Sequence, residues 1–296
     1  MAPTLGNSVS RRLSSVRSHL QEQPPLAAAL SAAATSDVDA RAIQFLRECV
    51  RIQTEVQEGE PCPGEVAVQK LISARLTEIG CQVSDMRYTA ENLVLKDEFA
   101  DSSGVQAGER VSVIGHLPAA AGAAGGRSLI LFAHPDGEPV AGTELWTQDP
   151  FAGDIVDGRI YGWGVADDLM GVAAGVCAMD LLASKGTVLK GDVMMCSTPS
   201  KRNANGVTAV MQNMELAGTA DAALYLHPAE SGAGLQEIKA LASGQLKFKI
   251  TVQGMPPDTT EPGHAAFSHL AINAIDKALV IRDGKPPPFA VLPLRQ

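Results

Sequence analysis

Residues 128–136 read SLILFAHPD and residues 222–228 read AALYLHP. Each segment is a short apolar run that ends in a histidine, a pattern typical of a buried strand in an α/β sheet. Polar groups at the carboxyl ends of such strands converge on one crevice, so His134 and His227 are expected to lie close together. Asp167 follows a Gly-Trp-Gly segment and is expected at the same crevice. Two imidazoles and a carboxylate are ligands that suit zinc.

Strands and helices are predicted to alternate along the first part of the chain. Apolar residues at helical spacing predict two helices between residues 38 and 80, separated by a loop at 57–64. Further helices are predicted at 168–183 and 207–216, and strands at 110–114, 128–133, 192–197 and 222–227. This alternation implies an α/β fold with a largely parallel sheet.

The chain is predicted to have three parts: an extension at 1–37, an α/β domain at 38–243, and a partial second domain at 244–296. The second domain starts with a polar–apolar alternation that predicts a strand at 245–252, followed by a helix at 270–281. One strand and one helix are too little for an independent core. We therefore expect the carboxyl end to be truncated or to depend on a partner.

Composition excludes several classes of function. The chain has 296 residues with 45% hydrophobic content, enough for a sizeable core. Its net charge of -9 argues against a nucleic-acid partner and against an anionic membrane surface. No apolar run approaches the ~20 residues of a membrane-spanning helix. The cysteines are odd in number and form no CxxC pair, so we expect a reducing, cytoplasmic compartment.

The amino-terminal segment is rich in serine and carries Arg11, Arg12 and Arg17, with no acidic residue before Glu22. This composition resembles an organellar transit segment, but a disordered or loosely helical extension is favoured.

Structural roles are the alternative for several of these residues. Asp167 and Asp168 stand where a loop becomes a helix, so both are candidate N-caps. The Gly162-x-Gly164 pair lacks the third glycine of a dinucleotide fingerprint, and the anion at Asp167 would repel phosphate. His264, after a Pro-Gly pair, fits an exposed loop on sequence periodicity alone.

A longer motif is more specific. Residues 146–151 read WTQDPF and residues 157–167 read DGRIYGWGVAD. This block resembles the W-x-x-x-P-F … D-G-x-x-Y-G-R-G-x-x-D block of the zinc-dependent family of acetylornithine deacetylases, succinyl-diaminopimelate desuccinylases and aminoacylases. The resemblance runs from about residue 43 to residue 281. It implies a three-layer, zinc exopeptidase-like catalytic domain followed by an α+β lid and dimerisation domain.

The resemblance also implies roles for individual residues. His134 matches a metal ligand, Asp136 its orienting carboxylate, and Asp167 the carboxylate that bridges two metals. His227 matches the position of a third ligand, which is a histidine in some subfamilies. His264 matches the lid histidine that reaches a neighbouring active site in a homodimer.

One segment of the chain departs from the family pattern in the residues that carry the chemistry. Where the family has T-x-D-E-E, this chain reads TPSKR at 198–202, so Lys201 and Arg202 replace the general base and a ligand of the second metal. A guanidinium cannot coordinate zinc and would repel a second dication. We therefore expect one Zn²⁺ per chain, at His134, Asp167 and His227, with cobalt or manganese as possible substitutes.

The implied reaction is hydrolysis of the amide bond of a small N-acyl amino acid or dipeptide. Lys201 is then a candidate replacement base, and Arg202 a candidate ligand for a substrate carboxylate. The alternative is an inactive homologue that keeps the fold as a binding or oligomerising module. Turnover of a panel of N-acyl amino acids distinguishes these two hypotheses.

Overall fold

The computed structural model describes residues 36–55, 62–93, 108–123, 125–201, 204–212, 220–227, 238–239, 250–257 and 270–283. The chain divides into two compact units, Met1–Ile238 and Lys239–Gln296.

The described part of the first unit begins with two helices, as predicted, α3 (Ser36–Val50) and α4 (Pro63–Ile79). Local capping sets the bounds of α4. The Cys62 thiol accepts a hydrogen bond from the Glu65 amide, and Pro63 occupies the first turn, where its missing N–H costs nothing. The helix ends at Gly80, whose φ of 94° is the left-handed conformation that glycine adopts without strain.

The main sheet contains β1 (Gln82–Tyr88), β2 (Arg110–Leu117), β6 (Val193–Ser197), β3 (Leu129–Ala133) and β7 (Ala222–Tyr225), in that spatial order. Strand β3 is parallel to both β6 and β7, whereas β2 is antiparallel to both β1 and β6. The α/β class is confirmed, and the sheet is mixed because β2 runs against its neighbours. Strands β6, β3 and β7 run in the same direction, and the candidate site lies at their carboxyl ends.

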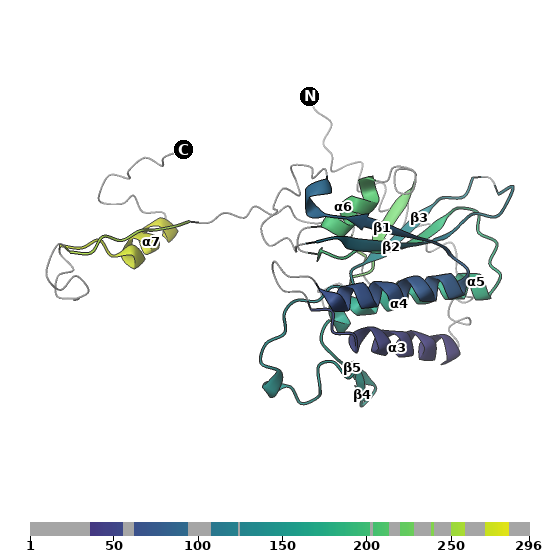
Figure 1. The fold of residues 1–296 in the computed structure, drawn as a ribbon, viewed down its shortest axis with the longest axis horizontal. Coiled ribbons are helices and arrows are strands. Elements are labelled where there is room, and N and C mark those ends of the chain that lie inside the picture. The colour runs from purple at the N-terminus through teal and green to yellow at the C-terminus, as the bar shows by residue number, and fades with distance from the viewer. Residues whose placement is uncertain are drawn as a thin grey trace, which may run out of the picture. The chain divides into compact units, whose positions relative to one another are not determined.

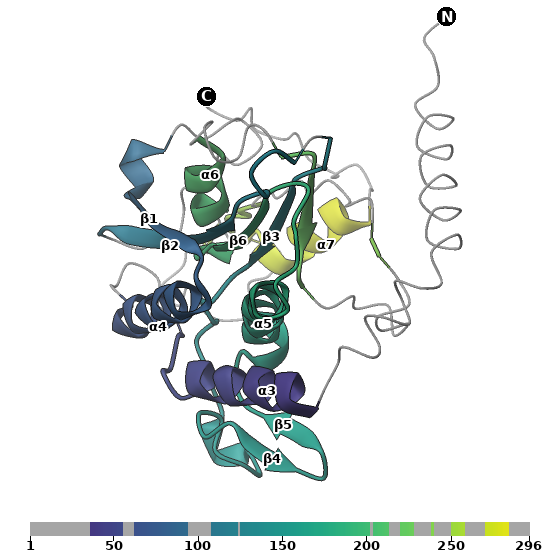
Figure 2. The same cartoon turned by 90° about the vertical axis from the view of Figure 1, so that its right-hand side faces the viewer.

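Helices cover both faces of this sheet (Figures 1 and 2). Helices α4 and α5 (Met170–Ser184) pack on one face, with α3 outside them, and α6 (Asn205–Gln212) packs on the other face. The sheet residues alternate accordingly: Val113 and Met195 join the core under α4 and α5, whereas Ile114 and Met194 join a smaller cluster with Val210 of α6. This is the expected three-layer arrangement.

Three strands were not predicted from the sequence. Strand β1 is mostly exposed, so it carries little apolar signal. Strands β4 (Asp154–Val156) and β5 (Arg159–Tyr161) form a small hairpin. Its turn is Asp157-Gly158, and both residues have positive φ, as two-residue hairpin turns require. An Asp-Gly pair between apolar residues was the available signal.

The segment before α5 is irregular. Residues Val165–Leu169 form a π-type turn, and the Asp167–Asp168 peptide bond is cis. The α-helix therefore starts at Met170, later than the sequence predicted. This irregular turn carries Asp167, the middle member of the candidate site.

The described part of the second unit is small. Met255 forms a bridge with Ile272, and α7 spans Ala274–Arg282. Helix α7 starts at Ala274 because the Asn273 side chain caps it, accepting a hydrogen bond from the Ile275 amide at 2.9 Å. Residues 250–252 are not strand, contrary to prediction, and the rest of the predicted strand lies outside the described residues. None of the described helices has the length and apolar character needed to cross a membrane.

Candidate metal centre

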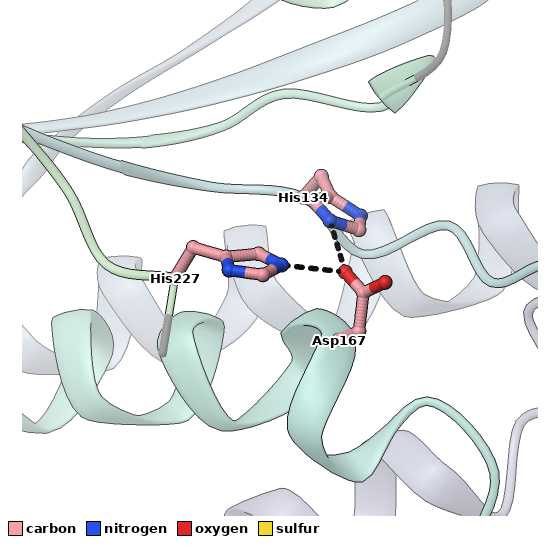
Figure 3. A group of neighbouring side chains, drawn as sticks. All are labelled: His134, Asp167 and His227. Atoms are coloured by element: carbon pink, nitrogen blue, oxygen red, sulfur yellow. Dashed lines mark hydrogen bonds and ion pairs between the residues drawn. The ribbon is translucent and has the colours of Figure 1, made fainter. Parts of the chain in front are cut away.

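Three side chains predicted from the sequence to share a crevice do meet. His134 directly follows β3, His227 lies just beyond β7, and Asp167 belongs to the turn that precedes α5. Because β3 and β7 are parallel neighbours, their carboxyl ends lie side by side and present both imidazoles to Asp167 (Figure 3). Oδ1 of Asp167 lies 3.0 Å from Nε2 of His134 and 2.9 Å from Nε2 of His227.

Contacts with Asp136 fix the orientation of the His134 ring. Its Nδ1 lies 3.0 Å from the backbone carbonyl oxygen of Asp136, and 3.6 Å from Oδ1 of the same residue. A carbonyl oxygen only accepts hydrogen bonds, so Nδ1 must carry the proton. In a neutral ring, Nε2 then presents a lone pair toward the Asp167 carboxylate. This is the tautomer in which a histidine binds a metal through Nε2.

The pKa of His134 reflects this environment. The side chain is 2% exposed, and its burial acts to lower the pKa. The hydrogen bond and charge of Asp136, together with the charges of Asp168 and Asp167, outweigh burial and leave the pKa raised. The site therefore favours positive charge between His134 and the carboxylates.

Asp136 connects His134 with the segment that follows β6. Its Oδ2 accepts a hydrogen bond from the backbone N–H of Lys201 at 3.2 Å. Burial raises the pKa of Asp136, but His134 and Arg110 lower it by a larger amount, so the net pKa is below its ordinary value. Asp136 is thus a charged carboxylate on the Nδ1 side of the His134 ring.

Lys201 lies at the front of the site. Its ammonium contacts both carboxylate oxygens of Asp167. Burial raises the pKa of Asp167, but the hydrogen bonds from Lys201 and His227 outweigh it, and the net pKa is lowered. Asp167 is therefore a carboxylate anion that two imidazoles and one ammonium share.

Asp168 was not predicted as a member of the site. Its side chain is 1% exposed, and its Oδ2 accepts a hydrogen bond from the backbone N–H of His134 at 3.3 Å. Oδ1 has no hydrogen-bond partner among the described residues. Burial raises the pKa of this carboxyl to about 6. The contact with His134, and not a helix cap, is the role that the geometry gives to Asp168.

A buried ion pair lies behind the segment that carries Lys201. Nε of Arg110 donates to Oε1 of Glu65 at 2.9 Å, and a second guanidinium nitrogen contacts Oε2. Arg110 also donates to the Ser200 hydroxyl, which connects the pair to the residue before Lys201. This cluster was not predicted from the sequence, because its members come from α4, β2 and a loop and share no motif.

Two predicted site residues, Arg202 and His264, lie outside the described residues. The remaining ones, His134, Asp136, Asp167, Lys201 and His227, are brought together.

The residues fit a divalent metal. One ligand atom from each of His134, Asp167 and His227 lies within 4.8 Å of the other two. Imidazole and carboxylate are ligands of zinc, and three protein ligands leave a fourth position for water or substrate. The hydrogen bond from Nδ1–H of His134 to the Asp136 carbonyl orients the ring so that Nε2 can bind a metal.

The chain is similar in sequence to the proteins of a known family. Residues 130–290, more than half of the chain, match Peptidase family M20/M25/M40. The chain belongs to this family. That assignment agrees with the resemblance inferred from the W-x-x-x-P-F and D-G-x-x-Y-G blocks.

Curated relatives include succinyl-diaminopimelate desuccinylases. The one from Rhodospirillum centenum is 33% identical over 147 residues, which cover 49% of this chain and 36% of the relative. The one from Methylocella silvestris is 28% identical over 243 residues, which cover 81% of this chain and 55% of the relative. The chain therefore spans between about a third and about half of the length of these relatives.

Among solved structures, the di-peptidase Dug1p from Saccharomyces cerevisiae aligns with a TM-score of 0.51 at 12% identity, covering 64% of this chain and 38% of Dug1p. This likeness concerns the fold alone.

Proposed function

We propose that this protein is a metal-dependent hydrolase of amide bonds in small N-acyl amino acids or dipeptides, with one zinc ion at His134, Asp167 and His227. The observation that carries the proposal is the meeting of two imidazole Nε2 atoms on one oxygen of Asp167. With Nδ1–H of His134 committed to a carbonyl, a neutral ring places a lone pair against a carboxylate. A cation bound by both groups would remove the repulsion between this lone pair and the Asp167 carboxylate.

A zinc ion in this position would polarise the amide carbonyl and lower the pKa of bound water from 15.7 toward roughly 7. The protein's own groups have separate tasks. Asp136 fixes the ring of His134, and Asp168 holds the backbone of the same residue. Arg202 is proposed to bind a substrate carboxylate and His264 to complete the site of a partner in a homodimer formed through residues 244–296.

The family membership and the desuccinylase relatives support amide hydrolysis as the reaction class. Desuccinylases are named for removal of an acyl group, so a small N-acyl amino acid is the proposed substrate.

Proton transfer is the catalytic step for which the chain lacks the usual glutamate. Lys201, which contacts Asp167 in this structure, stands where the family pattern has its general base, and a lysine ammonium has no lone pair with which to accept a proton, whether or not it stays on Asp167. Loss of general base catalysis typically costs about 10² to 10⁴ in rate. Slow hydrolysis is therefore expected. The same contact favours the second candidate function, an inactive homologue that retains the metal and acts as a binding module.

The first test is metal content. After chelation and reconstitution, elemental analysis should find about one zinc per chain, and cobalt should replace it. His134→Ala or Asp167→Ala should weaken zinc binding by more than about 100-fold, because each removes a ligand. Asp136→Asn is the control, since it keeps the carbonyl that holds Nδ1 and should cost about 10-fold.

Two tightly bound zinc ions per chain would contradict the single site, and no binding by the wild type would contradict the metal hypothesis. Hydrolysis of a panel of N-acyl amino acids by the zinc-loaded protein then separates the enzyme from the binding module. A rate that depends on zinc and is lost in His134→Ala supports the enzyme.

A further inference from the structure

The ammonium of Lys201 occupies the position where a cation would neutralise Asp167. It contacts both carboxylate oxygens, including Oδ1, the oxygen that both histidines approach. A metal ion bound between these three ligands would need the same oxygen. Lys201 and a metal ion are therefore alternative partners of Asp167.

The backbone that carries Lys201 is held firmly. Its N–H donates to Asp136 at 3.2 Å, and Thr198, three residues earlier, donates its N–H to the carbonyl of Ala133 at 2.9 Å. Ser200 has a φ of 70°, and its hydroxyl accepts a hydrogen bond from the buried Arg110. These contacts tie the segment to β3 and to the ion pair of Arg110 with Glu65. The main chain of Lys201 is therefore hydrogen-bonded beside the site.

The side chain of Lys201, in contrast, has access to solvent. It is 35% exposed, and the carboxylate that it contacts is 47% exposed. A lysine side chain is a flexible stem with four carbons, so its ammonium can turn to solvent while the backbone stays in place. Because the ammonium is tethered, its effective concentration at Asp167 stays high at any protein concentration.

We propose that Lys201 is a built-in competitor for the metal: its ammonium holds Asp167 in the metal-free protein and must withdraw before a divalent ion binds. This inference rests on the proposed function, since it concerns the same site. The exchange replaces one cation by another at a carboxylate and breaks no covalent bond. Lys201 then determines how tightly the site binds metal, because the metal must displace an existing partner and then tolerate a nearby positive charge.

The test is calorimetric titration of the chelated full chain with zinc chloride. Lys201→Met removes the competing charge and should raise the zinc affinity by about 10-fold or more. Lys201→Gln should act in the same direction, and Lys201→Arg, which keeps the charge, should stay within a few-fold of the wild type. The control is Lys70→Met, the same change on the exposed side of α4, which should leave the affinity unchanged.

A second readout does not need metal. In the chelated protein, acetylation of Lys201, measured by mass spectrometry, should be slow, because its amine lies against the carboxylate of Asp167 and must leave it to react. Asp167→Asn should increase the Lys201 acetylation rate several-fold and leave that of Lys70 unchanged.

The outcomes separate the two hypotheses. If the wild type binds zinc and Lys201→Met binds it no more tightly, the competitor is excluded and the metal site stands. If no variant binds zinc, both the metal site and the competition for it are excluded. If Asp167→Asn leaves the acetylation of Lys201 unchanged, the ion pair itself is absent in solution.

Discussion

The carboxylate of Asp167 is the anion that the other side chains of the site contact. Its carboxylate is approached by His134, His227 and Lys201, while Asp136 and Asp168 stand behind His134. The sequence predicted the two histidines and Asp167 because each follows a strand or a glycine-rich turn. It did not predict that Lys201 contacts Asp167, because the spacing along the chain says nothing about which way a side chain on a loop turns.

The same limit applies to the buried polar residues. Glu65 and Arg110 are 3% and 7% exposed, and either would be expected on the surface from residue type alone. Only the pairing of α4 with β2 brings them together, and that pairing depends on tertiary packing.

The cysteines give a prediction at the residue scale. Cys49 and Cys196 are buried, and burial raises their pKa from 9.0 to about 12. Thiolate is the reactive form, so at pH 8 these two should react with iodoacetamide roughly a thousand-fold more slowly than an ordinary exposed thiol. Labelling followed by mass spectrometry measures each site, and the same protein in guanidinium is the control, where all five cysteines should react rapidly. Rapid labelling of Cys196 in the native protein would contradict the burial of β6.

At the scale of elements, the apolar patterns predicted α3, α4, α5, β3, β6 and β7 correctly in type and approximately in bounds. Each of these elements except β7 has buried residues, so its sequence carries the periodicity. Strand β7 is exposed at all four positions, although its apolar run predicted a buried strand. Strands β1, β4 and β5 are exposed or short and were missed. The antiparallel direction of β2 was also missed, because the residues of a strand do not encode the direction of its neighbours.

Helix α5 packs closely against the segment after β7, and this close approach requires a glycine at position 171. A Cβ on Gly171 would lie 2.4 Å from Oδ1 of Asp168 and 2.5 Å from the carbonyl oxygen of Leu226. Gly171→Ala should therefore push α5 away from the residue that precedes His227. We expect a loss of roughly 1–3 kcal/mol in the free energy of unfolding and weaker zinc binding.

The control for this variant is Ala174→Gly on the exposed side of α5. It should cost about 1 kcal/mol through helix propensity and leave zinc binding unchanged. Denaturant unfolding and zinc titration of both variants check the prediction. Equal zinc affinities in Gly171→Ala and the wild type would show that the close approach of α5 does not position His227.

At the scale of the whole molecule, apolar side chains remain uncovered in both units. Strand β7 is an edge of the described sheet, and Leu224 and Tyr225 on it are 38% and 40% exposed. No residue of α7 is buried, and Ile275 is 70% exposed. Sheet edges and exposed apolar side chains are surfaces through which proteins associate.

A polypeptide of these 296 residues is therefore expected to self-associate. Light scattering after size exclusion should show species heavier than the 30.9 kDa monomer, in proportions that rise with concentration. Ile275→Lys should raise the fraction of monomer, because a charge on the exposed face of α7 opposes its burial against another molecule. Val188→Lys is the control: Val188 is 75% exposed in the loop between α5 and β6, outside β7 and α7, so this variant should behave as the wild type. A monodisperse wild-type monomer with one cooperative melting transition would mean that the exposed faces of β7 and α7 are stable in water, and the homodimer proposed through residues 244–296 would then lose its physical reason.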